Sequence, residues 1–191
     1  MAKLSDQRIH DRRNAIIEGA KAVFAAQGFT ETSMADIVRA AGVATGTVYR
    51  YFDSKEAVVM AVSESAMGSR YDSEDAPPAL PDAIEALIGA STDRRRGRLS
   101  NQVWGQAAAS SALQAMIADR HAAVSRWLAR SIDRHHLDEP GHVAPTEPSP
   151  QALHRAEVII CAISGLQQRI AEGVNMDVTA FSASLLAWAA L

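Results

Sequence analysis

Apolar residues recur with helical spacing from one end of the chain to the other, and this constrains the fold more than any other feature. Near the N-terminus, apolar residues occupy one helix face at i, i+1, i+4, i+7 and i+8; they are Ile16, Ile17, Ala20, Val23 and Phe24. No alternation typical of a strand has useful length, and no segment repeats. The chain is therefore predicted to be all-α, with about nine helices.

Helix-breaking and capping residues divide the first third of the chain. Gly28 is predicted to end the first helix, and Thr32 or Ser33 to cap the second. Gly42 permits a turn, after which a short helix is expected over about Thr45 to Phe52. A fourth helix should follow a cap at Asp53 or Ser54. The result is a helix, a glycine turn and a short helix packed on a longer first helix.

Proline-rich segments divide the remainder. The prolines in "EDAPPALP" (74–81) interrupt the helical pattern, and "DEPGHVAPTEPSP" (138–150) is predicted to be a loop. Between and after them, helical spacing predicts helices around Ile84 to Ile88, around Val103 and Trp104, and over about Ser111–His136, Pro150–Glu172 and Asp177–Ala190.

Composition indicates an ordinary globular protein. The 191 residues carry a formal charge of −3, so any nucleic-acid surface must be local. The one cysteine, Cys161, lies in an apolar run and is expected to be a small buried side chain in a reducing compartment. The N-terminus lacks the apolar core of a signal peptide, and no apolar run approaches the roughly 20 residues that span a bilayer. A cytoplasmic protein without a membrane segment is expected.

The stretch "GVATGTVYRYF" (42–52) follows a short amphipathic helix and a glycine turn. A helix, a tight turn and a second short helix packed on a longer one form a helix-turn-helix, whose second helix enters the major groove of DNA. Val48 and Phe52 are predicted to hold that helix against the core. The threonine and tyrosine hydroxyls between them would then face phosphates and base edges.

Residues 33–62 resemble the DNA-binding segment of TetR-family transcriptional regulators. The shared features are the turn Ala41-Gly42-Val43, the sequence Gly46-Thr47-Val48-Tyr49, the aromatic Phe52, and Ser54-Lys55-Glu56. The resemblance implies that the DNA contacts come from Ser33, Thr45, Gly46, Thr47, Tyr49, Tyr51 and Lys55. Ala44 stands where a capping serine is common, and Thr45 is then expected to cap the helix in its place. Arg50 is expected to be solvated or paired within the chain.

The resemblance also implies a C-terminal domain with an effector pocket and a dimer interface. Residues 1–54 are predicted to form the DNA-binding domain, and residues 55–191 the effector-binding and dimerisation domain. A largely apolar small molecule is expected to contact Met60, Met67, Tyr71, Ile84, Trp104, Met116, Ile117, His121, Trp127 and Gln168. The homodimer interface is expected to include Ile160, Ile163, Gln167, Ile170, Phe181, Leu185 and Trp188.

Other clusters point to no second activity. The arginine-rich "DRRRGR" (93–98) is expected to be a solvated turn or the charged start of a helix, and "DRHHLDE" (133–139) is not predicted to bind a metal. We find no nucleophile with a base, no phosphate loop and no paired carboxylates, so neither an enzyme nor a cofactor is predicted. The expected function is a homodimeric repressor that a small molecule releases from a palindromic operator. The alternative is an all-α carrier or interaction module with a vestigial helix-turn-helix.

Overall fold

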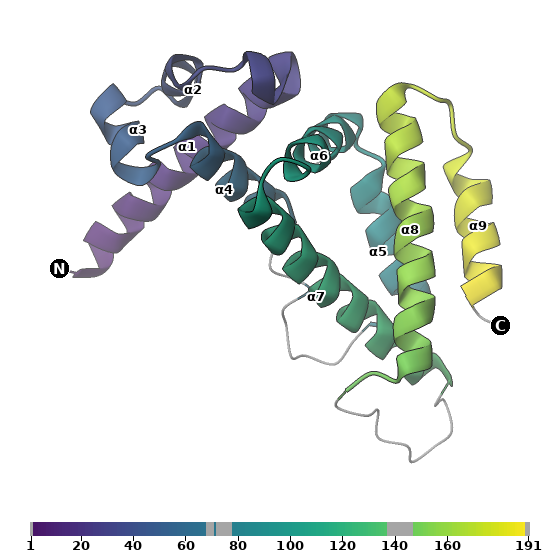
Figure 1. The fold of residues 1–191 in the computed structure, drawn as a ribbon. Coiled ribbons are helices and arrows are strands. Elements are labelled where there is room, and N and C mark those ends of the chain that lie inside the picture. The colour runs from purple at the N-terminus through teal and green to yellow at the C-terminus, as the bar shows by residue number, and fades with distance from the viewer. Residues whose placement is uncertain (1, 68–70, 72–77, 137–146, 190–191) are drawn as a thin grey trace. The chain divides into compact units, whose positions relative to one another are not determined.

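The fold is all-α in the computed structural model, which describes residues 2–67, 71, 78–136 and 147–189. Within those ranges there are nine helices and no strand, as predicted (Figure 1). The helices are α1 (Ala2–Glu31), α2 (Met34–Ala41), α3 (Thr45–Tyr51), α4 (Lys55–Met67), α5 (Leu80–Ser91), α6 (Arg94–Ala107), α7 (Ser111–His136), α8 (Pro150–Glu172) and α9 (Val178–Ala189).

The chain divides into two compact units. The first unit comprises Met1–Gly68 and Leu99–Leu113, and the second comprises Ser69–Arg98 and Gln114–Leu191. Helices α6 and α7 therefore each contribute residues to both units. The units describe packing rather than function, so the predicted boundary between residues 54 and 55 stays a prediction.

The core of the first unit is built on α1, with α2 and α4 packed against it. Ile16, Ile17 and Phe24 on α1 are almost completely buried, as their helical spacing predicts. The ring of Phe24 meets that of Phe29 edge to face, with 4.4 Å between their centroids. Gly28 interrupts α1 with a φ of 85°, which agrees with the predicted stop, although one more helical turn follows it.

The core of the second unit joins α5, α7, α8 and α9. Its fully buried members include Ile84, Leu128, Ile132, Ile159 and Leu166. The arginine-rich segment begins α6 and is capped by Asp93, whose carboxylate accepts bonds from the backbone N–H groups of the following residues. Of the two expectations for this segment, a solvated turn or the charged start of a helix, the second is therefore correct.

Most helix limits in the second half follow the sequence pattern. Helices α7 and α8 have the predicted bounds, and α9 begins one residue later than expected. Cys161, in contrast, was predicted to be buried and is exposed. The reason is helical phase: α8 turns Ile159 and Ile163 inward, which places Cys161 on the opposite face.

Two predicted loops lie largely outside the described ranges, since residues 72–77 and 137–146 are not among them. In the part of the chain that the structure covers, no helix combines the length and apolar character needed to cross a bilayer.

Candidate nucleic-acid interface

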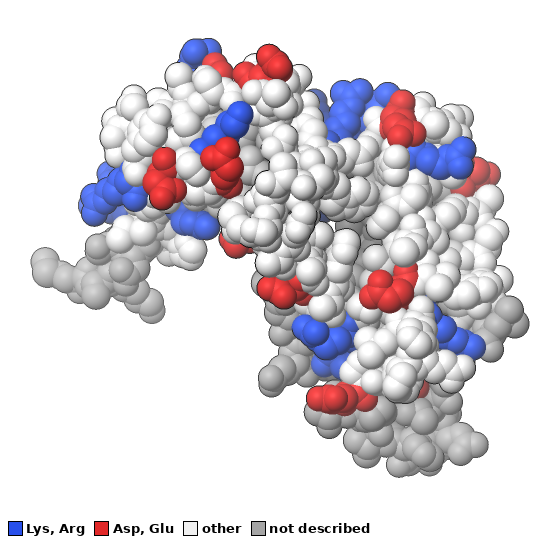
Figure 2. Space-filling model, viewed as in Figure 1, with Lys and Arg blue, Asp and Glu red and all other residues white. Residues whose placement is uncertain are grey.

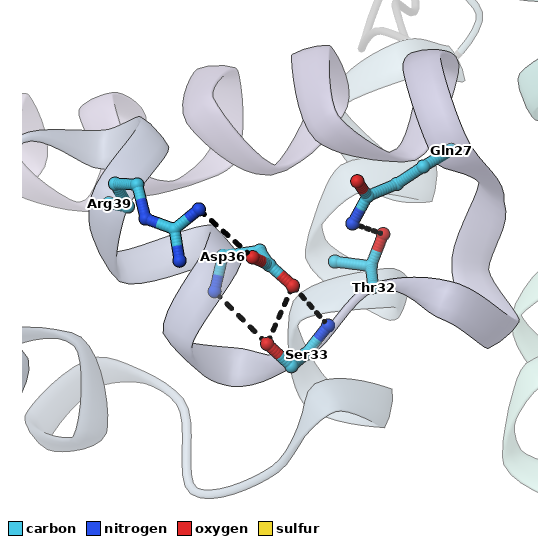
Figure 3. Close-up of polar contacts among 5 residues, drawn as sticks. All are labelled: Gln27, Thr32, Ser33, Asp36 and Arg39. Carbon is cyan, nitrogen blue, oxygen red and sulfur yellow. Dashed lines mark hydrogen bonds and ion pairs between the residues drawn. The ribbon is translucent and has the colours of Figure 1, made fainter.

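Ser33 and Asp36 form a reciprocal capping box at the start of α2 (Figure 3). The Ser33 hydroxyl accepts a bond from the Asp36 backbone N–H at 3.2 Å and donates to Asp36 Oδ2 at 2.6 Å. The Ser33 backbone N–H donates to the same carboxylate oxygen at 3.0 Å. Thr32, the other predicted cap, is buried and donates its hydroxyl to the Gly28 carbonyl instead. The box fixes where α2 begins.

The capping box also changes the chemistry of Asp36. The hydroxyl and the backbone N–H of Ser33 lower the pKa of the Asp36 carboxyl, the positive charge of Arg39 adds to this, and partial desolvation opposes it. Arg39 Nη1 lies 3.3 Å from Asp36 Oδ1. A carboxylate therefore already occupies the N-terminus of α2, where the resemblance implied that Ser33 lies near a DNA phosphate.

The turn after α2 is held by two glycines. Gly42 has a φ of 65° and donates its N–H to the Arg39 carbonyl, which ends α2 in the left-handed conformation that glycine adopts readily. Gly19 lies on α1 beneath this end of α2. A Cβ added at Gly19 would stand 2.7 Å from the Ala41 backbone nitrogen. Gly19 was not among the residues predicted to matter, and its only signal in the sequence was a glycine inside an apolar helical pattern.

Helix α3 begins without a side-chain cap. Its N-cap residue is Ala44, whose carbonyl accepts bonds from the N–H groups of Thr47 at 2.8 Å and Val48 at 3.3 Å. The prediction that Thr45 caps α3 is wrong, because Thr45 is already the first helical residue. Its side chain is exposed at the N-terminal end of α3, so it stays available as a candidate DNA contact.

The predicted division of α3 into a buried and an exposed face is confirmed. Val48 and Phe52 are buried, and the Arg13 guanidinium lies 5.6 Å from the centre of the Phe52 ring. Tyr49 is 50% exposed, an unusual environment for a large aromatic side chain. The remaining candidates on this helix also reach the surface: Thr45 and Gly46 are exposed, and Thr47 and Tyr51 are half-buried.

Lys55, at the start of α4, has partners inside the protein. Its ammonium donates to the Phe29 carbonyl at 2.8 Å and to the Thr30 carbonyl at 3.4 Å. These carbonyls belong to the last turn of α1, where a positive charge is favourable. The resemblance implied a phosphate contact for Lys55; in this structure the side chain joins the end of α1 to the start of α4.

Charge is balanced in this part of the chain. Residues 1–68 contain eight lysines and arginines and eight aspartates and glutamates. Both signs are interspersed over the face in view (Figure 2). Some cations are paired: Arg13 lies 3.9 Å from Glu64, and Lys21 lies 2.7 Å from Glu18. Any attraction to DNA must therefore come from the local arrangement of residues rather than from net charge.

The ten predicted effector contacts fall in both units. In the second unit, Tyr71 meets Trp127 edge to face with 5.1 Å between centroids, and both pack on the cluster that contains Ile84. Ile117 is buried, Met116 is half-buried, and His121 and Gln168 are exposed. In the first unit, Met60 and Trp104 are half-buried, and the side chain of Met67 lies outside the described part.

The predicted dimer contacts show a range of exposure. Ile163 and Leu185 are buried within their own unit, whereas Ile160, Gln167, Ile170 and Phe181 are half-buried. Trp188 is 43% exposed on α9. Val158 on α8 is 50% exposed and was not among the predicted contacts. Sequence periodicity identified the apolar helices but could not say which apolar side chains their own unit covers.

No cluster of three or more histidine, cysteine, aspartate or glutamate side chains suited to a metal occurs among the described residues. Residues 137–139 of the histidine-rich segment 133–139 lie outside the described ranges.

Comparison of the sequence with known proteins identifies the same segment of the chain. Residues 16–62 match the family described as bacterial regulatory proteins, tetR family. The regulator BetI of Rhizobium meliloti is 34% identical over 85 residues, which cover 44% of this chain and 37% of BetI. The chain spans less than half the length of the curated relatives it matches.

Solved structures extend the likeness in fold to nearly the whole chain. A TetR transcription regulator from Haloarcula marismortui superposes with a TM-score of 0.76 at 14% identity, covering 94% of this chain and 97% of its own. FadR from Bacillus subtilis, solved with stearoyl-CoA, has a TM-score of 0.68 at 18% identity, covering 92% and 96%. The matched segment, residues 16–62, contains the whole helix-turn-helix described above, and this part of the chain belongs to the TetR family of bacterial regulatory proteins.

Proposed function

We propose that this chain is a ligand-responsive, sequence-specific DNA-binding transcriptional regulator, and that it acts as a homodimeric repressor. The exposed face of α3 carries the proposal. Val48 and Phe52 anchor that helix, while Thr45, Gly46 and Tyr49 stay exposed. Thr45 lies at the N-terminal end of this short anchored helix and Tyr49 one turn later, and their exposed hydroxyls suit contacts with phosphates and base edges.

Gly46 supports the same surface. A Cβ added there would meet no atom within 4 Å, so the fold itself does not require glycine at this position. Glycine inside a helix costs about 0.5–1 kcal/mol relative to alanine. The cost would be offset if the absence of a side chain lets another molecule come close to the helix backbone. We propose that this molecule is DNA, with α3 in its major groove.

The direct test measures binding of the purified protein to DNA from upstream of its own gene and to operators selected from random sequence. Tyr49→Ala should weaken specific binding at least about tenfold, because each half-site loses a hydrogen bond and ring contact. The control is Gln114→Ala, an exposed side chain on α7. Equal affinity of Tyr49→Ala and wild type would refute the proposed reading surface.

Gly46→Ala and Gly105→Ala make a matched pair, since both glycines are exposed helical positions with nothing near an added Cβ. Both variants should be slightly more stable than wild type, but only Gly46→Ala should lose operator affinity. A salt series separates the proposal from the carrier alternative. Phosphate contacts release counterions, so the affinity of a regulator should fall steeply with salt.

The dimer is proposed from the outward faces of α8 and α9. Val158 and Trp188 are exposed large apolar side chains in the single chain, and Cys161 is also exposed on α8. A two-fold pairing across these faces would cover them and present two α3 helices to half-sites roughly 34 Å apart. Sedimentation equilibrium should give a dimer, and Trp188→Glu should shift it toward the monomer.

The effector pocket is proposed for the second unit, around Tyr71 and Trp127. FadR, which has a similar fold, was solved with stearoyl-CoA, a ligand that carries a long apolar acyl chain. Release by a ligand requires one conformation that binds DNA and another that does not. A small molecule would release the operator only if its affinity for the second conformation exceeds its affinity for the first. Screening apolar compounds against the protein–operator complex tests this, and release of DNA is the expected result.

A further inference from the structure

A cavity of about 190 Å³ lies in the first unit, apart from the effector pocket proposed above. It forms where the end of α1, the start of α4 and the α6–α7 turn meet, and all its lining residues belong to that unit. Its lining includes only one predicted DNA contact, Lys55, and only one predicted effector contact, Met60, so neither predicted set accounts for it.

Four of the lining residues are apolar. Three of them, Phe29, Val59 and Leu113, are 3%, 6% and 3% exposed, and the fourth, Met60, is half-buried. An apolar cavity of roughly 150 Å³ is large enough for benzene, which has six non-hydrogen atoms. By that measure, this cavity suits a ligand of about six to eight non-hydrogen atoms with an apolar body.

The lining also contains one cationic side chain. This is Lys55, and two of the three N–H groups of its ammonium are directed to the Phe29 and Thr30 carbonyls. The third N–H can therefore bond an acceptor placed in the cavity. Lys55 is also the first residue of α4, and the N-terminal end of a helix favours a negative charge nearby.

Glu56 is the one acidic side chain in the lining, and it is exposed at the rim. Solvent screens an exposed carboxylate, so it lowers anion affinity without excluding an anion. A cationic ligand fits less well, because Lys55 already occupies the two backbone carbonyls that would attract it.

We infer that this cavity binds a short-chain monocarboxylate, with the carboxylate on Lys55 and the alkyl chain against Phe29, Val59, Met60 and Leu113. Hexanoate, with eight non-hydrogen atoms, represents the class. The regulatory consequence rests on the proposed function: a carboxylate that holds the third N–H of Lys55 competes with a DNA phosphate for it. Binding of the carboxylate itself does not depend on DNA.

The test uses the full chain without DNA, labelled with ¹³C at its six methionine methyl groups. Met60→Leu identifies the Met60 signal. Sodium hexanoate, 1-hexanol and hexylammonium chloride are titrated at constant ionic strength. Hexanoate should shift the Met60 signal saturably in the millimolar range, and hexanol, with the same chain and no charge, should bind at least tenfold more weakly. Equal binding of hexanol, or an unmoved Met60 signal, would overturn the inference.

Charge variants give a second, independent readout. Glu56→Gln should tighten hexanoate binding about two- to threefold, because it removes one like charge from a solvated rim. Glu85→Gln on α5, also an exposed acid, is the control and should change nothing. Lys55→Gln should abolish binding in protein that a thermal melt shows to be folded. Weaker hexanoate binding in Glu56→Gln, or a preference for hexylammonium, would contradict the carboxylate assignment.

Failure of this test leaves the proposed DNA-binding function untouched, because no DNA is present in it. If hexanoate binds but leaves operator affinity unchanged, the site stands and only the competition with a phosphate at Lys55 is overturned.

Discussion

Replacing Gly19 with alanine tests how the helix-turn-helix is held on α1. The added Cβ would lie 2.7, 2.8 and 2.9 Å from the backbone nitrogen and Cα of Ala41 and the carbonyl carbon of Ala40. Ordinary contact needs about 3.5 Å, so α1 and α2 would have to separate by roughly 0.7 Å. Both surfaces are backbone, and no side-chain rotation can relieve the clash.

The magnitude follows from two opposing terms. Overpacking a well-packed site costs about 1–3 kcal/mol, and a contact between two backbones belongs at the upper end of that range. Alanine favours the helix over glycine by about 1 kcal/mol. Gly19→Ala should therefore destabilise the first unit by about 2 kcal/mol.

The assay is thermal unfolding followed by circular dichroism, with Gly105→Ala as the matched control. Gly105 is a helical glycine in the same unit whose added Cβ would meet nothing within 4 Å. The control should melt at or slightly above the wild-type temperature, and Gly19→Ala several degrees below it. If the two variants melt together, close backbone packing at Gly19 is not what holds α2.

Ser33→Ala should destabilise the first unit by about 1 kcal/mol in urea unfolding, because it removes the capping box. Asp36 has a lowered pKa, so its contribution is present above about pH 3.8, the ordinary carboxyl value, and is lost as pH falls through the lower folded value. An acid titration should therefore show a smaller loss of stability in Ser33→Ala than in wild type. Cys161 is exposed in the single chain and should react rapidly with a maleimide in dilute monomer but slowly in dimer. Equal rates would place the interface elsewhere. Lys55→Met should lower stability by roughly 1–3 kcal/mol through the lost bond to the Phe29 carbonyl, even without DNA.

Local patterns predicted the helices well, because their signals lie within a few residues of each helix. Pro150 at the start of α8 and Gly173 after its end mark the limits of that helix, and both act through their own backbone geometry. Ser33 is a similar case, since its capping partner is only three residues away. Val48 and Phe52 were assigned to the buried face of α3 from their spacing alone.

Features that depend on distant segments could not be predicted in the same way. Lys55 bonds a carbonyl 26 residues earlier in the chain, which no local pattern encodes. The burial of Cys161 was predicted wrongly because an apolar neighbourhood in sequence does not fix which side of a helix faces the core. The requirement for glycine at position 19 depends on the backbone of Ala41, 22 residues later in the sequence, so no local pattern encodes it either.

Helices α6 and α7 each pass from one compact unit to the other without a break. The first unit is consequently discontinuous in sequence. Gly28, for example, lies beside the side chain of Gln102, which comes much later in the chain. A fragment that ends after α4 would lack Leu99–Leu113 and leave part of its apolar surface uncovered. A cut at one position therefore cannot separate the two units, and a chimaera that exchanges the second unit between relatives must keep the α6–α7 turn with the first unit.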